Sequence, residues 1–338
     1  MGKHITIKDI AKALGISTST VSRALADTWD VKHETRDKVL AMARELNYHP
    51  NLNAKNLHNK RSGIIGFIIP EFINGFFPTV IEGIQEVLQR EGYGVLIVQS
   101  NESREQERKN LYLLDEKMVE GIIISITNEG GNEEHYKHIM DAGTPIVFFN
   151  RVCENLDAPK VVIDDTQMAE MAVNHLINSG YKRIAHLAGP SNLLVAHKRI
   201  EGYKNALRKH NIDIDEQNII ESGIFIKDGI NTAKQMLNSN IPLPDAIFCF
   251  NDPVAIGAMK ALKEAGVRIP DDVAIVGFSE DIMATIVEPP LTSVRQPMKE
   301  MGQQAAKLIL EQIKSEKPIK PKTYVLEAKL NIRKSSKR

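Results

Sequence analysis

The feature that most constrains the fold is a series of short apolar runs rich in β-branched residues, each followed by an amphipathic helical stretch. Short strands that alternate with helices predict βαβ units, in which parallel sheets carry helices on both faces. The predicted strands lie at residues 63–70, 94–100, 121–125, 145–150, 160–164, 183–189, 246–250, 274–278 and 323–330. Nine strands suit two doubly wound sheets better than one very wide sheet. The expected fold class is therefore α/β, with two lobes.

The two lobes are expected to share residues 62–338. We predict that the first lobe contains residues 62–160 plus 291–322, and that the second contains 161–290 plus 323–334. In a fold of this kind a ligand lies in the cleft that faces the carboxyl ends of both sets of strands. The cleft between the lobes is therefore the predicted ligand site.

The first 48 residues have a different pattern, with helical periodicity and no predicted strand. Thr6 is expected to cap a helix together with Asp9, and Gly15 to end that helix in a left-handed conformation. Ser17 is expected to cap a second helix, and a third follows over residues 33–48. Two short helices joined by a glycine-containing turn indicate a helix-turn-helix, although an ordinary three-helix unit has a similar pattern.

Residues 49–61 separate the two patterns and are predicted to be a hinge. Pro50 prevents the preceding helix from continuing. The segment NLNAKNLH (51–58) is long enough for about two helical turns, which do not persist alone in water. At the other end of the chain, KSSKR (334–338) is expected to fray.

Charge is distributed unevenly although the formal net charge is +0. Residues 1–61 contain eleven Lys and Arg against six Asp and Glu, so this part carries +5 and the remainder −5. A cationic headpiece suits a polyanion such as DNA, but a solvated helical surface would have the same charge. Cys153 and Cys249 lie far apart, which indicates reduced core residues. Neither a signal peptide nor a membrane span is evident, so a cytoplasmic protein with no membrane partner is expected.

The segment TIKDIAKALGISTSTVSRAL (6–25) closely resembles the DNA-binding segment of the LacI/GalR family of repressors, and PNLNAKNL (50–57) resembles the hinge of that family. The resemblance continues through GYKRIAHLAG (180–189), FNDPVAIGAMKAL (250–262) and PLTSVRQPMKEMG (290–302), and covers essentially the whole chain. It implies a helix-turn-helix headpiece, a hinge and a dimerising, periplasmic-binding-protein-like effector domain.

The resemblance also implies roles in DNA binding. Thr18, Ser19 and Arg23 would reach base edges, Ser17, Thr20 and Ser22 would contact phosphates, and Leu57 would wedge into the minor groove. The full set that the resemblance assigns to DNA is Thr6, Ser17, Thr18, Ser19, Thr20, Ser22, Arg23, Asn51, Ala54 and Leu57.

For the effector, the resemblance implies that Phe76 and Phe77 form a stacking face and that Arg199, Asn251 and Asp252 provide hydrogen bonds. Without the resemblance, the two aromatic residues would be interpreted as ordinary core residues and Arg199 as a solvated residue of a helix. The chain departs from the family at two positions. Ser279 stands where many members have Asp, and Ile224 stands where an aromatic residue is usual. The sequence therefore does not distinguish between a sugar, a sugar phosphate and a purine-like molecule as the effector.

The sequence disfavours two other classes of function. An enzyme is disfavoured because the sequence contains no nucleotide-binding glycine pattern and no catalytic constellation. A secreted sugar carrier is disfavoured by the cationic headpiece. The sequence predicts no cofactor and no metal site. The expected function is a homodimeric repressor that binds a near-palindromic operator under effector control, with one headpiece on each half-site.

Overall fold

The computed structural model describes residues 5–25, 31–48, 62–73, 75–315, 317 and 319–337. The chain forms two compact units, residues 1–62 and 63–338. The predicted hinge (residues 49–61) lies entirely outside the described residues, and with it the predicted DNA contacts Asn51, Ala54 and Leu57.

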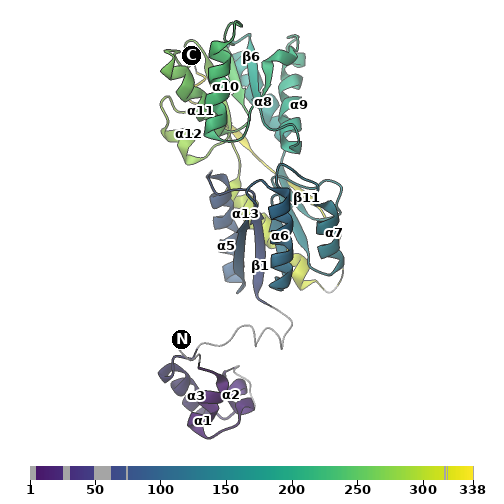
Figure 1. Ribbon diagram of the computed structural model, residues 1–338, viewed down its shortest axis with the longest axis vertical. Coiled ribbons are helices and arrows are strands. Elements are labelled where there is room, and N and C mark those ends of the chain that lie inside the picture. Colours follow the sequence, from purple (N-terminus) through teal and green to yellow (C-terminus); the bar gives the residue numbers. More distant parts are fainter. Residues whose placement is uncertain are drawn as a thin grey trace. The chain divides into compact units, whose positions relative to one another are not determined.

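The headpiece consists of α1 (Ile7–Leu14), α2 (Thr18–Leu25) and α3 (His33–Glu45), as the sequence predicts (Figure 1). The Asp9 carboxylate accepts hydrogen bonds from the Thr6 backbone N–H (2.8 Å) and the Thr6 hydroxyl (2.7 Å). Gly15 ends α1 with φ of 67°, a left-handed conformation that glycine adopts without steric cost. The buried side chains that hold the three helices together are Ile10, Ala11, Val21, Ala24, Val39 and Ala43.

The second unit contains two α/β lobes, which confirms the predicted fold class (Figure 1). The first lobe has a parallel sheet in the strand order β11-β5-β4-β3-β1-β2. Its strands are β1 (Ile64–Ile69), β2 (Gly94–Gln99), β3 (Gly121–Ile124), β4 (Ile146–Phe149), β5 (Lys160–Ile163) and β11 (Thr323–Leu326). Its helices are α5 (Phe76–Arg90), α6 (Arg104–Glu116), α7 (Glu133–Asp141) and α13 (Met298–Lys314).

The second lobe has the strand order β12-β10-β9-β8-β6-β7. Only the pairing of β12 with β10 is antiparallel. Its strands are β6 (Ile184–Ala188), β7 (Ile219–Glu221), β8 (Ala246–Cys249), β9 (Ala274–Ser279), β10 (Thr292–Arg295) and β12 (Lys329–Asn331). Its helices are α8 (Asp165–Asn178), α9 (Leu194–Lys209), the short 3₁₀ helix η1 (Glu216–Asn218), α10 (Ile226–Asn238), α11 (Asp252–Glu264) and α12 (Ile282–Ile286).

The lobe boundaries predicted from the sequence were wrong at three strands. β5 and β11 belong to the first lobe, and β10 belongs to the second. The chain crosses between the lobes three times, after β5, after β10 and after β11. The run 323–330 therefore contains two strands in different sheets, because the third crossover interrupts it. β7 and β10 were not predicted, and the sequence of β10, TSVR, contains no apolar run that could have indicated a strand.

Ser335 and Ser336 hold the described part of the C-terminal tail, residues 334–337, in place, contrary to the expectation that the tail frays. Ser335 and Ser336 are fully buried. The Ser335 hydroxyl accepts a hydrogen bond from the Thr292 backbone N–H (2.8 Å) and donates one to the Ile275 carbonyl (2.6 Å). The tail is held because these two small hydroxyl residues satisfy polar groups beside β9 and β10.

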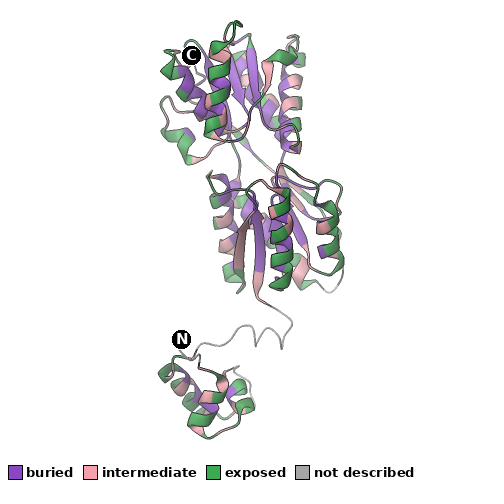
Figure 2. Ribbon diagram, viewed as in Figure 1, coloured by how far each residue is buried: buried purple, intermediate pink, exposed green. Residues whose placement is uncertain are grey.

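Burial follows the layered architecture (Figure 2). The strands at the centre of both sheets are buried, whereas the outer faces of the helices are exposed. α5 and α13 approach closely, because a Cβ atom at Gly83 would lie 2.1 Å from the carbonyl oxygen of Lys299. Cys153 and Cys249 are both buried and free, as the sequence predicts. Among the described residues, no helix is long and apolar enough to cross a membrane.

Candidate functional site

The headpiece presents one polar face on α2. Thr18, Ser19, Ser22 and Arg23 are exposed, while Val21 on the opposite face is buried in the three-helix core. The alternation follows from the helical period, because the small hydroxyl residues lie between the apolar positions. Arg23 folds back along the helix, and its Nε donates a hydrogen bond to the Ser19 carbonyl (3.3 Å).

The N-terminus of α2 carries three neighbouring hydroxyl groups. The Ser17 hydroxyl accepts a hydrogen bond from the Thr20 backbone N–H (3.1 Å). It also lies 2.7 Å from the Ser19 hydroxyl and 2.8 Å from the Thr20 hydroxyl. Thr6 occupies the same position at the start of α1 and is exposed. Helix N-termini with hydroxyl donors suit phosphate oxygens, because free N–H groups and the helix dipole favour an anion there.

A second site lies in the cleft between the two lobes. Five of the six predicted effector residues line this cleft: Phe76, Phe77, Arg199, Asn251 and Ser279. The space between the lining side chains, including the part open to solvent, is about 520 Å³. Lining residues that the sequence did not single out include Glu71, Asn150, Arg151, Phe250, Asp281 and Gln296.

Phe76 and Phe77 begin α5 and form an apolar wall of the cleft. Their side chains are 7% and 3% exposed, and their rings meet edge to face with centroids 5.1 Å apart. Phe77 also packs edge to face on Phe149 of β4, at 6.2 Å. These rings therefore belong to the core of the first lobe and also line the cleft, and their role as a stacking face for the effector stays a prediction.

Arg199 is a buried residue of α9, so its interpretation as a solvated helix residue is wrong. Its side chain is 3% exposed. Nε and Nη2 donate to one oxygen of Asp165 (2.9 and 2.8 Å), and Nη1 donates to the Phe250 carbonyl (2.6 Å). The guanidinium also lies 3.7 Å from the centre of the Phe278 ring. Burial raises the pKa of Asp165, and the guanidinium opposes that rise by stabilising the carboxylate.

The second arginine that lines the cleft is also paired with a carboxylate of the protein. Arg151 follows β4 and donates through Nη1 to both carboxylate oxygens of Glu102, at 2.8 and 2.9 Å. Both side chains are largely buried. Each arginine of the cleft therefore has a carboxylate partner within the protein.

Asn251 and Asp252 differ in position although they are adjacent in sequence. Asn251 lines the cleft and caps α11, where its Oδ1 accepts from the Val254 backbone N–H (2.9 Å). Its Nδ2 donates to the Ile224 carbonyl (2.9 Å), and the Ile224 side chain itself is buried. Asp252 is fully buried and is not among the cleft-lining residues, contrary to its predicted role. Burial raises the pKa of Asp252 to about 7.

The turn that follows β9 completes the polar side of the cleft. Gln296 donates through Nε2 to the Ser279 hydroxyl (3.2 Å). The Gln296 Oε1 atom is buried and has no hydrogen-bond partner among the described residues. The Asp281 carboxylate caps α12 by accepting from the Met283 backbone N–H (2.8 Å). The lobes approach closely here, since a Cβ atom at Gly75 would lie 3.1 Å from Cβ of Asp281.

Some of the lining residues that were not predicted could have been found from their positions at the ends of predicted strands. Glu71, Arg151 and Phe250 directly follow or end runs predicted as strands, at residues 63–70, 145–150 and 246–250. Ligand sites in doubly wound sheets form at the carboxyl ends of strands. The pairing of each arginine carried no such signal, because the partners lie far apart in sequence.

Comparison with known proteins identifies the family. Residues 62–329 match the periplasmic binding proteins and sugar binding domain of the LacI family, and residues 6–51 match the bacterial regulatory proteins of the lacI family. The chain is 35% identical to the ribose operon repressor of Halalkalibacterium halodurans, over 98% of this chain and 97% of that protein. The chain belongs to the LacI family.

Other LacI-family proteins agree with this assignment. The repressor CytR of Escherichia coli K12 is 34% identical over 92% of this chain and 90% of that protein. Among solved structures, the Lac repressor dimer bound to operator and the anti-inducer ONPF aligns with a TM-score of 0.88 and 27% identity, over 99% of this chain and 100% of that chain. These relatives are transcriptional repressors and not enzymes, and this LacI-family chain is a DNA-binding regulator with an effector domain.

Proposed function

We propose that this LacI-family regulator acts in the cytoplasm as a homodimeric repressor. Two headpieces read a near-palindromic operator, and an uncharged, hydroxyl-rich effector in the cleft changes the affinity for that operator. Twofold symmetry relates the two half-sites, because each headpiece of a symmetric dimer meets one of them.

The exposed face of α2 supports the DNA-binding part of the proposal. Thr18, Ser19 and Arg23 are the side chains proposed to read base edges in the major groove, with Arg23 donating to guanine. The hydroxyl groups at the N-terminus of α2, together with Ser22 and Thr6, are proposed to hold phosphates. Asn51, Ala54 and Leu57 of the hinge remain proposed contacts.

Exposed apolar side chains support a dimer. Ile226 of α10 and Ile282, Met283 and Ile286 of α12 are 41%, 74%, 41% and 66% exposed. Both helices contact α11, and all four side chains belong to the second lobe. Large apolar side chains gathered on a surface indicate a protein partner.

The paired arginines carry the proposal about the effector. Arg151 and Arg199 already face Glu102 and Asp165. Glu71 and Asp281 add further carboxylates to the lining. A phosphate ester would meet more negative than positive charge there, whereas the hydroxyl groups of a neutral ligand could donate to carboxylates and to Gln296 Oε1.

Binding measurements on the full chain test this proposal. We expect an uncharged sugar from a panel that includes D-ribose and cellobiose to raise the melting temperature and to change operator affinity, because a ligand stabilises the state that it binds. D-ribose 5-phosphate and hypoxanthine should have little effect. Tight binding of the phosphate ester would contradict the proposed effector class.

A pair of glutamine variants locates the binding. Gln296→Ala should weaken binding of the active sugar about tenfold, because a buried hydrogen bond to the ligand is lost. Gln303→Ala is the matched control, since Gln303 lies on α13 and bonds to Glu86 rather than to the cleft. Equal effects of the two changes would argue against the cleft as the effector site.

A further inference from the structure

The turn Ser279–Asp281 has an unfavourable backbone conformation beside the cleft. Ser279 and Glu280 have φ of 127° and 55°, values that favour glycine. Ser279 and Asp281 line the cleft, but Glu280 between them is not among the lining residues. Non-glycine residues keep such conformations only where the surrounding structure holds them in place. Some contact outside the cleft must therefore fix this turn.

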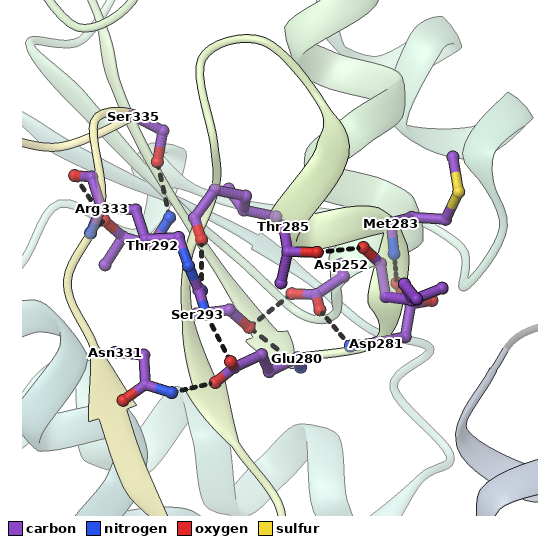
Figure 3. Close-up of polar contacts among 12 residues, drawn as sticks. Asp252, Glu280, Asp281, Met283, Thr285, Thr292, Ser293, Asn331, Arg333 and Ser335 are labelled. Atoms are coloured by element: carbon purple, nitrogen blue, oxygen red, sulfur yellow. Dashed lines mark hydrogen bonds and ion pairs between the residues drawn. The ribbon is translucent and has the colours of Figure 1, made fainter.

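The Glu280 side chain provides that contact (Figure 3). Its Oε2 accepts a hydrogen bond from Nδ2 of Asn331 (2.5 Å), and its Oε1 forms an ion pair with Nη2 of Arg333. The side chains of Glu280 and Arg333 are only 10% and 21% exposed. An ion pair that is this well shielded is much less screened by salt than a pair on the surface.

Arg333 is held in place by hydrogen bonds of its own. Its Nη1 donates to the Leu291 carbonyl (2.9 Å), and its backbone N–H donates to the Thr292 hydroxyl (2.7 Å). Asn331 is the last residue of β12, where it pairs with Ser293 of β10. The side chains that hold Glu280 therefore belong to a segment fixed to the sheet of the second lobe.

The backbone of the turn is held from the opposite side by Asp252. The Asp252 carboxylate accepts from the Asp281 backbone N–H (3.1 Å) and from the Ser293 hydroxyl (2.6 Å). The Ser293 hydroxyl accepts in turn from the Glu280 backbone N–H (3.1 Å). The N–H groups of Glu280 and Asp281 are thus bonded inside the lobe (Figure 3). Ser279 and Asp281 line the cleft.

We propose that Glu280 is a positioning residue of the effector site. Its carboxylate, held by Asn331 and Arg333, keeps the turn in the left-handed conformation that presents Ser279 and Asp281 to the ligand. The role in ligand binding rests on the proposed effector function of the cleft. The role in holding the turn does not, so the two are tested separately.

Hydrogen–deuterium exchange on the full chain without ligand tests the contact itself. Glu280→Gln and Arg333→Gln should each accelerate exchange of the amides at residues 280–283 at least about tenfold, because local opening of the turn becomes easier. Arg268→Gln is the matched control. It breaks an exposed ion pair with Asp272, just before the other end of β9. Exchange that is unchanged in both Glu280→Gln and Arg333→Gln would overturn the proposal.

Calorimetry with D-ribose tests the consequence for binding. If the turn without the ion pair between Glu280 and Arg333 adopts the binding conformation about one tenth of the time, the Kd rises about tenfold. The affinity falls in proportion to the fraction of molecules that have the binding conformation. The double variant should bind no more weakly than the weaker of the two single variants, because both changes remove the same ion pair. Arg333→Lys keeps the charge and should restore most of the affinity. Additive losses, or a Kd unchanged in folded Glu280→Gln, would overturn the positioning role.

The exchange and calorimetry experiments distinguish failure of this inference from failure of the proposed function. If the wild-type chain binds no uncharged sugar, the proposed effector class is wrong, and the exchange rates still decide whether Glu280 holds the turn. If D-ribose binds and exchange is unchanged, the effector proposal stands and the role of Glu280 is wrong. Circular dichroism of each variant confirms that the chain is folded.

Discussion

Replacement of Arg199 by methionine should destabilise the effector domain through the carboxylate that it leaves behind. The guanidinium makes two hydrogen bonds to Asp165 and one to the Phe250 carbonyl. Methionine fills much of the same volume but cannot donate any of these bonds. The Asp165 side chain is only 5% exposed, so its carboxylate would remain in the interior without its cation.

The expected magnitude follows from this burial. Removing one partner of a buried ion pair costs about 3–5 kcal/mol, because the remaining charge is not compensated. For a domain of this size the melting temperature should fall by about 6–15 °C. The double variant Arg199→Met, Asp165→Asn should recover a large part of that loss, because asparagine carries no charge. Arg208→Met, which removes an exposed pair with Glu201 on the same helix, should change the stability by less than about 1 kcal/mol.

The loss should also depend on pH. Burial already raises the pKa of Asp165, and removal of the guanidinium should raise this pKa further. When the folded-state pKa of an acid lies above its unfolded value, the folded state binds the proton more tightly, and stability is lost as the pH rises between the two values. Arg199→Met should therefore destabilise the chain more at pH 8 than at pH 5.

Thermal unfolding of the full chain, followed by circular dichroism at both pH values, measures these effects. The explanation would be refuted by equal losses for Arg199→Met and Arg208→Met. A loss that neither changes with pH nor recovers when Asp165 is replaced would refute it as well.

Three further changes test other parts of the structure. Arg23→Ala should cost about 1–3 kcal/mol per half-site on operator DNA and little on scrambled DNA, as measured by fluorescence anisotropy, if Arg23 reads a base. Gly83→Ala should lower the melting temperature, because the new methyl group would meet the Lys299 carbonyl and force α5 away from α13. His186 is fully buried, and burial lowers its pKa to about 4, so the folded state should lose up to about 3 kcal/mol as the pH falls from 6.5 towards 4. His186→Phe should flatten that part of the stability curve in acid titrations, and an unchanged slope would contradict the assignment.

The sequence predicted those parts of the fold that depend on local pattern. Apolar strands such as β1 and β8 were found because both of their faces are buried. β10 was missed because it lies where the chain changes lobe and carries Thr, Ser and Arg. Which lobe a strand joins depends on the crossovers, and these leave no periodicity in the sequence.

In the cleft, too, the sequence predicted individual residues but not the partners that only the fold brings together. Arg199 was chosen correctly as a cleft residue, but its partner Asp165 lies 34 positions away and only the fold brings the two together. The family resemblance places Asp252 in the cleft beside Asn251, but its side chain is fully buried and does not line the cleft, because successive residues at the start of α11 point in different directions. The positive φ of Ser279 could not be predicted, since nothing in a serine marks it for that conformation.

The three crossovers have a consequence for biosynthesis. β11 and β12 follow the other described strands in chain order, and one completes each sheet. Neither lobe can therefore acquire its full set of strands before residues 323–331 have been synthesised, whereas all three headpiece helices end by Glu45. At ordinary elongation rates the nascent chain would carry a complete headpiece for on the order of tens of seconds before either lobe could finish folding. A ribosome that stalls late in the message would thus display a finished DNA reader on a body that cannot yet bind its effector.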